Sequence, residues 1–471
     1  MKNRVIGRTK ELKRLQELYE SGKPEFVAIY GRRRVGKTFL IRQMFGNEFV
    51  FDLAGLANSN TEKQLLNFNI AINHSGNCEF ELVENWLLAF EQLRTLIEKS
   101  KKERKIVFID EIPWLDTPHS GFISALEHFW NGWACARNDL MLIVCGSATS
   151  WIINKLINNH SGLHNRITTA IHLHPFTLSE TGLFLKSQGI EYSRYQIAEC
   201  YMIMGGIPYY LSKLKRGLSV AQNIDNLFFE RDAELKNEFK NLYASLFKDA
   251  ADYIKVVEAL SKKTKGLTRN EILEATKMQS GGTFSEILKN LERCDFIRRY
   301  SLPTKRKRDV LYQLLDAYTL FYFKYLEKSN EQDEHFWTNT ANSPQHNAWA
   351  GYAFEILTLQ HTSQIKRALG ISGVQTAIFT WRSVQCEPAA QIDLVIDRKD
   401  GIINLCEIKF SQTQFAIDKG YEENLRNKIA AFINETKTRK AVHLLMITTF
   451  GLQKNKYFSI AQKEVVLDDL F

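Results

Sequence analysis

Glycines, a lysine and a threonine near the start of the chain are spaced for phosphate binding. The stretch GRRRVGKT at residues 31–38 follows the pattern G-x-x-x-x-G-K-[ST]. The apolar run 26–30 before it predicts a buried strand, and the residues after it, which contain no helix breaker, predict a helix. Glycines allow sharp turns in such a loop, so backbone N–H groups and the helix N-terminus can converge on phosphate oxygens.

Each residue of this loop is expected to have its own role. Lys37 would reach the β- and γ-phosphates of a nucleotide, and the Thr38 hydroxyl would bind Mg²⁺. Backbone amides would form the cradle, which leaves the three arginines free to point outward. The predicted nucleotide-binding segment comprises Gly31, Arg32, Arg33, Arg34, Val35, Gly36, Lys37, Thr38 and Phe39.

A second apolar run ends in two carboxylates. Residues 106–109 predict a buried strand that leads directly into Asp110 and Glu111. Asp110 can bind Mg²⁺, and Glu111 can orient and deprotonate the water that attacks the γ-phosphate. Together with the glycine loop, this order predicts a hydrolytic site at the carboxyl ends of parallel strands.

Three further polar residues follow a third apolar run at 140–145. Ser147 and Thr149 could contact the γ-phosphate or the attacking water, and the alternative is a polar strand end without such a contact. Arg166 could act as an arginine finger, within its own chain or on a neighbour, and the alternative is a surface salt bridge. The chain contains no N/T-K-x-D guanine signature, so adenine is the expected base.

Five segments in their order resemble the archaeal-type ATPases, relatives of the AAA+ and STAND nucleotide switches. They are VIGRTKEL (5–12), GRRRVGKT (31–38), IVFIDE (106–111), LIVCGSATS (142–150) and GGIPYY (205–210). The resemblance implies ATP and Mg²⁺ as cofactors, and it implies that Ile6 and Arg8 lie against the adenine. It also implies a helical lid whose Gly-Ile-Pro turn, with Pro208, closes over the base.

Residues 252–314 have the pattern of a winged helix-turn-helix. A helix is expected over 253–260, and Thr268 and Thr283 would each open a further helix through a capping box with a glutamate three residues later. Two strands, 296–300 and 310–314, complete the predicted wing.

Basic residues are concentrated in that wing, and no acidic residue lies between positions 298 and 308. A wing of this charge can lie along the phosphate backbone of double-stranded DNA. The alternative is a packing or switch module without DNA contact. The basic residues are Arg298, Arg299, Lys305, Arg306, Lys307 and Arg308.

Acidic residues and a lysine near the C-terminus are spaced for a second metal site. A helix over 349–360 carries Glu355, and two strands joined by a hairpin carry Asp393 on one side and Glu407 with Lys409 on the other. Asp393 and Glu407 could bind Mg²⁺ across the hairpin, while Lys409, on the same face as Glu407, could polarise a water. The alternative is a strand that places its charges in solvent.

This pattern resembles the PD-(D/E)XK restriction-endonuclease-like fold. The resemblance implies that Asp393, Glu407 and Lys409 form a nuclease core, with Glu355 as support from the helix. Gln391 stands where an acidic residue often precedes the metal-binding aspartate, which weakens a second metal position.

Composition excludes several other classes of protein. The N-terminus lacks the apolar core of a secretory signal, and no apolar run approaches the ~20 residues of a membrane span. The seven cysteines form no CxxC pair, which favours reduced thiols and a cytoplasmic location. The formal net charge of +9 permits an acidic partner.

The expected fold class is α/β, with four domains. These are a P-loop ATPase core with a parallel sheet (1–175), a helical lid (176–248), a winged helix-turn-helix (249–330) and an α/β restriction-endonuclease-like domain (331–471). The expected function is that of an ATP-hydrolysing switch that regulates a C-terminal DNA-binding or DNA-cleaving domain. The alternative is a nucleotide-gated scaffold with an inactive nuclease-like domain, and the sequence leaves open whether the chain forms a homo-oligomer.

Overall fold

The computed structural model divides the chain into two compact units, Met1–His174 and Pro175–Phe471. It describes residues 5–76, 80–158, 162–163, 165–263, 265–301, 310–327, 333–341, 343–383 and 390–471. The division lies next to the boundary expected after residue 175.

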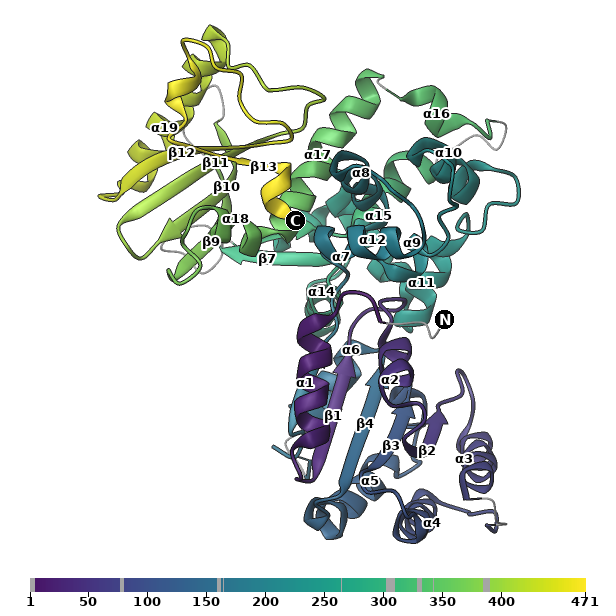
Figure 1. The fold of residues 1–471 in the computed structure, drawn as a ribbon. Helices are drawn as coiled ribbons and strands as arrows, with labels where there is room; N and C mark the ends of the chain where they lie inside the picture. Colours follow the sequence, from purple (N-terminus) through teal and green to yellow (C-terminus); the bar gives the residue numbers. More distant parts are fainter. Residues whose placement is uncertain are drawn as a thin grey trace. The chain divides into compact units, whose positions relative to one another are not determined.

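A five-stranded parallel sheet forms the centre of the first unit (Figure 1). The strand order is β2-β3-β4-β1-β5, so β1 lies between strands that come much later in the chain. Because β1, β3 and β4 are apolar runs, they can be buried on both faces, as parallel strands in α/β folds are. The strands are β1 (Glu25–Tyr30), β2 (Phe49–Ala54), β3 (Lys105–Asp110), β4 (Leu140–Gly146) and β5 (Thr169–His172).

Helices cover both faces of this sheet. Alternate strand residues such as Phe26, Val107 and Leu142 pack with α3, α4 and α5 in one large hydrophobic cluster. On the other face, the Arg42 guanidinium of α2 lies 5.7 Å from the centre of the Phe108 ring. The helices are α1 (Thr9–Glu20), α2 (Lys37–Phe45), α3 (Thr61–Gly76), α4 (Trp86–Lys99), α5 (Phe122–Gly132) and α6 (Thr149–Trp151).

The second unit begins with short helices and continues into the predicted winged-helix region. The capping box at Thr268 is confirmed, because its hydroxyl accepts from the Glu271 N–H and the Glu271 side chain accepts from the Thr268 N–H. The capping box expected at Thr283 is wrong: α14 already begins at Gly282, so Thr283 lies inside the helix. The elements are α7 (Leu178–Ser187), α8 (Arg194–Met204), α9 (Pro208–Leu211), α10 (Val220–Ile224), α11 (Glu238–Leu246), α12 (Ala250–Ser261), β6 (Leu267–Thr268), α13 (Arg269–Thr276), α14 (Gly282–Arg293), β7 (Ile297–Ser301) and β8 (Val310–Leu314).

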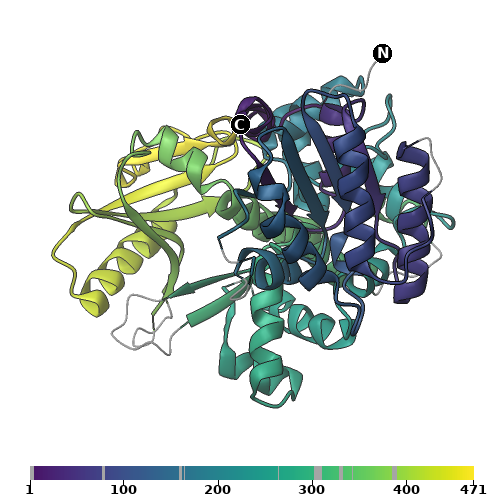
Figure 2. The ribbon, with the colours of Figure 1, turned by 90° about the horizontal axis from the view of Figure 1, so that it is seen from below.

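A second five-stranded sheet, of mixed direction, forms the C-terminal part of this unit. Its order is β13-β12-β11-β10-β9; β9, β10 and β11 are antiparallel neighbours, whereas β11, β12 and β13 run parallel. Helix α19 lies along one face of the sheet (Figure 2). On this face the Phe432 ring of α19 packs on the Trp381 ring of β9. The elements are α15 (Ala317–Phe321), α16 (Phe336–Thr340), α17 (Pro344–Gln360), α18 (Thr362–Ala368), β9 (Thr376–Arg382), β10 (Gln391–Arg398), β11 (Ile402–Lys409), α19 (Lys419–Thr436), β12 (Ala441–Thr448) and β13 (Lys463–Val466).

The basic wing can be followed only in part. Lys305, Arg306, Lys307 and Arg308 lie outside the described residues. Arg298 does not fit the prediction of a phosphate contact, because its Nε donates to Gln313 Oε1 at 2.8 Å and its guanidinium lies over the Tyr300 ring. Burial lowers the pKa of Arg298 to about 10.

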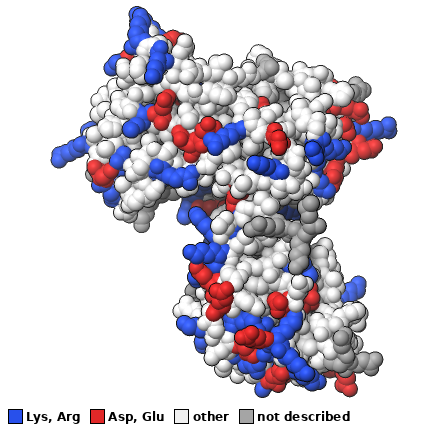
Figure 3. Space-filling view, viewed as in Figure 1, with Lys and Arg blue, Asp and Glu red and all other residues white. Residues whose placement is uncertain are grey.

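Surface charge and cysteines add two further observations. On the face seen in Figure 3, basic and acidic side chains are interspersed on both units, so the positive net charge forms no single basic surface there.

Five of the cysteines lie among the described residues and all five are free, in agreement with the expected reduced thiols. No helix within the described part of the chain is long and apolar enough to cross a membrane.

Candidate functional site

The glycine loop follows β1 at the carboxyl edge of the first sheet. Gly31 has a φ of 145°, and a Cβ there would lie 2.3 Å from the Leu173 carbonyl oxygen, so only glycine fits. Gly36 has a φ of 92° and precedes α2. The Lys37 ammonium lies inside the loop, where it donates to the carbonyl oxygens of Gly31 at 2.9 Å and Arg32 at 3.1 Å.

The structure brings Thr38 and Asp110 together. The Thr38 hydroxyl donates to Asp110 Oδ2 at 2.7 Å, although the two residues are 72 positions apart. Burial raises the pKa of Asp110, and the nearby charge of Glu111 adds to this, while the Thr38 hydrogen bond and Lys37 oppose it. A hydroxyl and a carboxylate oxygen this close are hard ligands that fit one shared Mg²⁺.

Glu111 is held from the neighbouring strand end. Its Oε2 accepts from the Ser147 backbone N–H at 3.0 Å and from the Ser147 hydroxyl at 2.9 Å. Ser147 therefore orients Glu111, a role that differs from the predicted contact with phosphate or water. Thr149 is fully buried, and its hydroxyl lies 3.5 Å from the Ser147 carbonyl oxygen, so it faces the strand end as well.

Three non-glycine residues around the loop have left-handed backbone conformations. Their φ values are 57° for Arg8, 73° for Arg34 and 44° for Glu111. Such conformations cost about 1–2 kcal/mol each and concentrate at functional sites. Arg8 is also tied to the loop, since its guanidinium donates to the Val35 carbonyl oxygen at 3.1 Å.

The expectation that all three loop arginines point outward is wrong for Arg32. Arg33 is exposed and Arg34 is half-buried, but only 1% of the Arg32 surface is accessible.

Arg166 lies at the opposite edge of the sheet from the loop. Strand β5 runs parallel to β1, with Tyr30 opposite His172 at the carboxyl end. Arg166 precedes the amino end of β5, and about 15 Å of strand separates that end from the loop. This placement contradicts a contact with the nucleotide site of its own chain.

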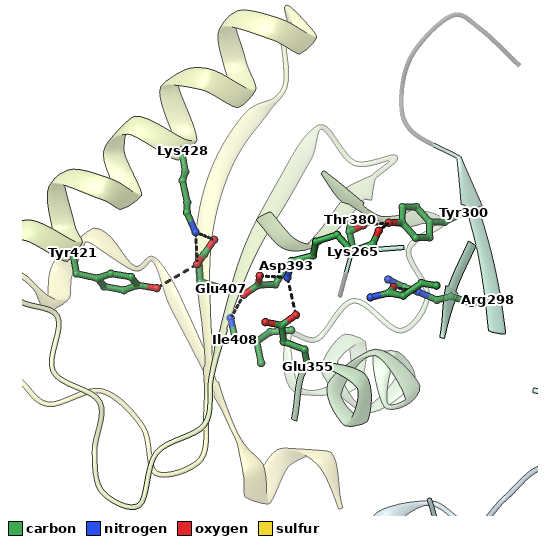
Figure 4. A network of polar contacts seen from close by, with 11 residues as sticks. Lys265, Arg298, Tyr300, Glu355, Thr380, Asp393, Glu407, Ile408, Tyr421 and Lys428 are labelled. Atoms are coloured by element: carbon green, nitrogen blue, oxygen red, sulfur yellow. Dashed lines mark hydrogen bonds and ion pairs between the residues drawn. The ribbon is translucent and has the colours of Figure 1, made fainter. Parts of the chain in front are cut away.

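The acidic residues expected near the C-terminus also come together (Figure 4). The register of β10 and β11, in which Leu394 pairs with Cys406, places Asp393 opposite Glu407, as the hairpin predicted. Glu355 approaches from α17. The ammonium of Lys265 lies between two of these carboxylates, 2.7 Å from Glu355 Oε2 and 2.6 Å from Asp393 Oδ1.

Glu407 has a separate set of partners from α19. Both of its carboxylate oxygens lie 2.8 Å from the Lys428 ammonium, and the Tyr421 hydroxyl donates to Oε2 at 3.3 Å. Only 2% of the Glu407 surface is exposed. The Lys409 ammonium lies 5.1 Å from the centre of the Tyr421 ring, on the same side of the sheet.

Burial and mutual repulsion shape the ionisation of these carboxyl groups. Burial raises the pKa of Glu355, and the charge of Asp393 raises it further against the opposing effect of Lys265. Burial by itself would also raise the pKa of Asp393. The charge and hydrogen bond of Lys265 outweigh this effect and lower the pKa of Asp393. Lys265 thus holds Asp393 ionised.

Comparison with known proteins agrees with the geometry of the first unit. Residues 6–214 match a family described as an ATPase domain predominantly from Archaea. This segment of the chain is a P-loop ATPase domain of that family. The match contains the whole glycine loop, Asp110, Glu111 and Ser147.

Three longer comparisons extend beyond the ATPase domain. An uncharacterized protein of Methanocaldococcus jannaschii, MJECL04, is 26% identical over 357 residues, which cover 74% of this chain and 75% of that protein. The solved structure of the Walker-type ATPase PABY2304 of Pyrococcus abyssi has a TM-score of 0.50 at 17% identity and covers 68% of this chain and 96% of its own. A STAND protein of Pyrococcus horikoshii is more remote, with a TM-score of 0.31 at 16% identity over 79% of this chain and 52% of its own.

Several residues that complete these sites carry no signal in the sequence. Lys265, on a turn, lies 90 and 128 positions from the two carboxylates that it binds, and Lys428, on a helix, lies 21 positions from Glu407. Arg8 was expected to lie against the adenine, and its contact with the loop was not predicted. Pro208 begins α9 in the second unit, and its predicted place over the base of the nucleotide stays a prediction.

Proposed function

We propose that the ATPase domain binds ATP with Mg²⁺ and hydrolyses it, and that its nucleotide state controls the second unit. The contact between Thr38 and Asp110, beside a loop that encloses Lys37, carries this proposal. Lys37 holds the β- and γ-phosphates, and Thr38 and Asp110 hold the metal ion. Mg²⁺ bound there would neutralise charge on the transferred phosphoryl group.

Glu111 is the proposed base for the attacking water. Its Oε2 is fixed by Ser147, which leaves Oε1 to accept a proton from water. Arg8 and Ile6 border the proposed adenine site, and adenine is favoured because no guanine signature is present.

Binding of Mg-ATP tests the first step of this proposal. Calorimetry should detect saturable uptake by the intact chain and a loss of about 100-fold or more in affinity for Lys37→Ala. The exposed Lys10 on α1 gives a matched control, and Lys10→Ala should bind as the wild type does. Equal affinities for Lys37→Ala and wild type would contradict the assignment of the loop.

For the second unit we propose a metal-dependent phosphodiester site. The observation that favours it is the convergence of Asp393, Glu407 and Glu355 from two strands and a helix, with Lys409 two residues after Glu407. Carboxylate oxygens suit Mg²⁺, and Lys409 could orient the water that attacks a phosphodiester. Double-stranded DNA is the proposed substrate, bound through the winged-helix region and the C-terminal part of the unit.

A nicking assay on supercoiled DNA tests this second proposal. Cleavage by the wild type should require Mg²⁺ and should vanish in Asp393→Ala, whereas Asp397→Ala on the same strand should retain it. Asp397 is a fair control because it pairs with Lys440 instead of the proposed metal site. Equal cleavage by wild type and Asp393→Ala would point to a contaminating nuclease, and no cleavage by any variant would favour the nucleotide-gated scaffold.

A further inference from the structure

The carboxylates of the proposed phosphodiester site already have a cation among them, supplied by the chain itself. Lys265 lies between α12 and β6 in the predicted winged-helix region, whereas Glu355 and Asp393 belong to α17 and β10. Its ammonium binds one oxygen of each, at 2.7 and 2.6 Å (Figure 4). The three side chains are largely buried, with 13%, 19% and 10% of their side-chain surfaces exposed.

Two contacts position the backbone of Lys265 and Gly266 in this state of the protein. The Tyr300 hydroxyl donates to the Lys265 carbonyl oxygen at 2.5 Å, and the same hydroxyl contacts Thr380 of β9. The next residue, Gly266, has a φ of 80°, and a Cβ there would lie 2.4 Å from the Tyr312 carbonyl oxygen. Only glycine allows the turn to approach β8 this closely, so the turn presents Lys265 at one defined place.

The ammonium and a divalent ion would compete for the same oxygens. Asp393 Oδ2 accepts from the Ile408 N–H at 2.9 Å and Oδ1 accepts from Lys265 at 2.6 Å, so groups of the chain itself bind both oxygens of this carboxylate. A buried carboxylate cannot bind an ammonium and a metal ion through one oxygen in the same direction. A metal ion can therefore occupy this position only when Lys265 has left it.

We infer that Lys265 is an internal lock on the proposed metal site, which excludes the divalent ion while the winged-helix region contacts the C-terminal sheet. This inference rests on the proposed phosphodiester site and adds its regulation. Movement of Lys265, together with β6, away from α17 and β10 would withdraw the ammonium and expose Glu355 and Asp393 together. A movement of the winged-helix region would thus change the metal affinity of the carboxylates on α17 and β10.

Titration with Mn²⁺ in the absence of nucleotide tests the lock without relying on enzyme activity. The electron paramagnetic resonance signal of free Mn²⁺ measures uptake by the full chain. Lys265→Met should bind Mn²⁺ at least about tenfold more tightly than the wild type, and the gain should vanish in Lys265→Met combined with Asp393→Asn. Lys262→Met removes an exposed lysine that pairs with Glu258 nearby, and it should behave as the wild type does.

The outcomes separate the lock from the site on which it rests. If the wild type and Lys265→Met bind Mn²⁺ equally, and Asp393→Asn abolishes binding in both, the lock is overturned and the metal site remains. If Lys265→Met shows no Mn²⁺ binding that depends on Asp393, both the lock and the metal site are overturned.

A second measurement uses the wild-type chain, in case Lys265→Met fails to fold. Acetylation of lysines, followed by mass spectrometry, should find Lys265 far less reactive than Lys262, and saturating Mn²⁺ should raise the reactivity of Lys265 while that of Lys262 stays unchanged. Unchanged reactivity of Lys265 at saturating Mn²⁺ would overturn the lock.

Discussion

The two carboxylate sites of this protein use lysine in opposite ways. In the ATPase domain, Lys37 donates to the carbonyl oxygens of its own loop, and the acidic residues Asp110 and Glu111 are held by hydroxyl and amide donors. In the second unit, Lys265 and Lys428 bind the carboxylates directly. The first arrangement leaves the acids available for a metal ion and a water, whereas the second neutralises them.

The groups that hold a cluster of acids at a strand end decide how readily a metal ion can bind there. Where hydroxyl groups hold the acids, a metal ion can bind after only a small rearrangement of the side chains. Where lysines hold them, metal binding requires that an ion pair be broken first, so the second site is suited to control by movement of its elements.

The largest effect is expected on the stability of the second unit, at the ion pair between Lys428 and Glu407. Lys428→Met removes the only ammonium that the described residues place on this buried carboxylate, so unfolding of the second unit should become easier by about 3 kcal/mol. The double variant with Glu407→Gln should recover most of the loss. Denaturant unfolding followed by intrinsic fluorescence measures both, and wild-type stability of Lys428→Met would show that the pair contributes nothing.

A smaller effect is expected at the hydroxyl that orients Glu111. Ser147→Ala removes one of the two hydrogen bonds to Oε2 and keeps the backbone N–H, so ATP turnover should fall by about tenfold. Binding of Mg-ATP should remain, because Lys37 is held by carbonyl oxygens of its own loop and Thr38 is held by Asp110. Steady-state kinetics would contradict the assigned role if Ser147→Ala changed KM alone.

The smallest effect is expected at Arg166. Because Arg166 lies at the amino edge of the sheet, Arg166→Ala should leave turnover in dilute protein within about twofold of the wild type. A strong loss at every protein concentration would contradict its placement. A loss that grows with protein concentration would instead indicate that Arg166 completes the site of a neighbouring chain.

The sequence predicted the parts of these sites that depend on local spacing. The loop, its flanking strand and helix, and the positions of Asp110 and Glu111 follow from residues adjacent in the chain, whose geometry the backbone dictates. The pairing of Asp393 with Glu407 was also predictable, because Asp400-Gly401 sets the hairpin register.

Other features depend on contacts that local spacing does not encode. Lys265 reaches Asp393 across 128 positions, and nothing distinguishes it from its basic neighbours. The position of Arg166 required the strand order, which places β5 beside β1. Ser147 was expected at the right strand end, but its partner could be known only from the register of β3 and β4.

Hydrolysis of ATP by the wild type and by Glu111→Gln, measured in single-turnover and steady-state assays, shows whether Glu111 acts as the base in the ATPase domain. The account predicts Mg²⁺-dependent hydrolysis by the wild type and a loss of about 100-fold or more in Glu111→Gln, which should still bind ATP with nearly unchanged affinity. The exposed Glu91 on α4 supplies the control, since Glu91→Gln should hydrolyse ATP normally. Hydrolysis by Glu111→Gln at the wild-type rate, or none by the wild type, would contradict the account.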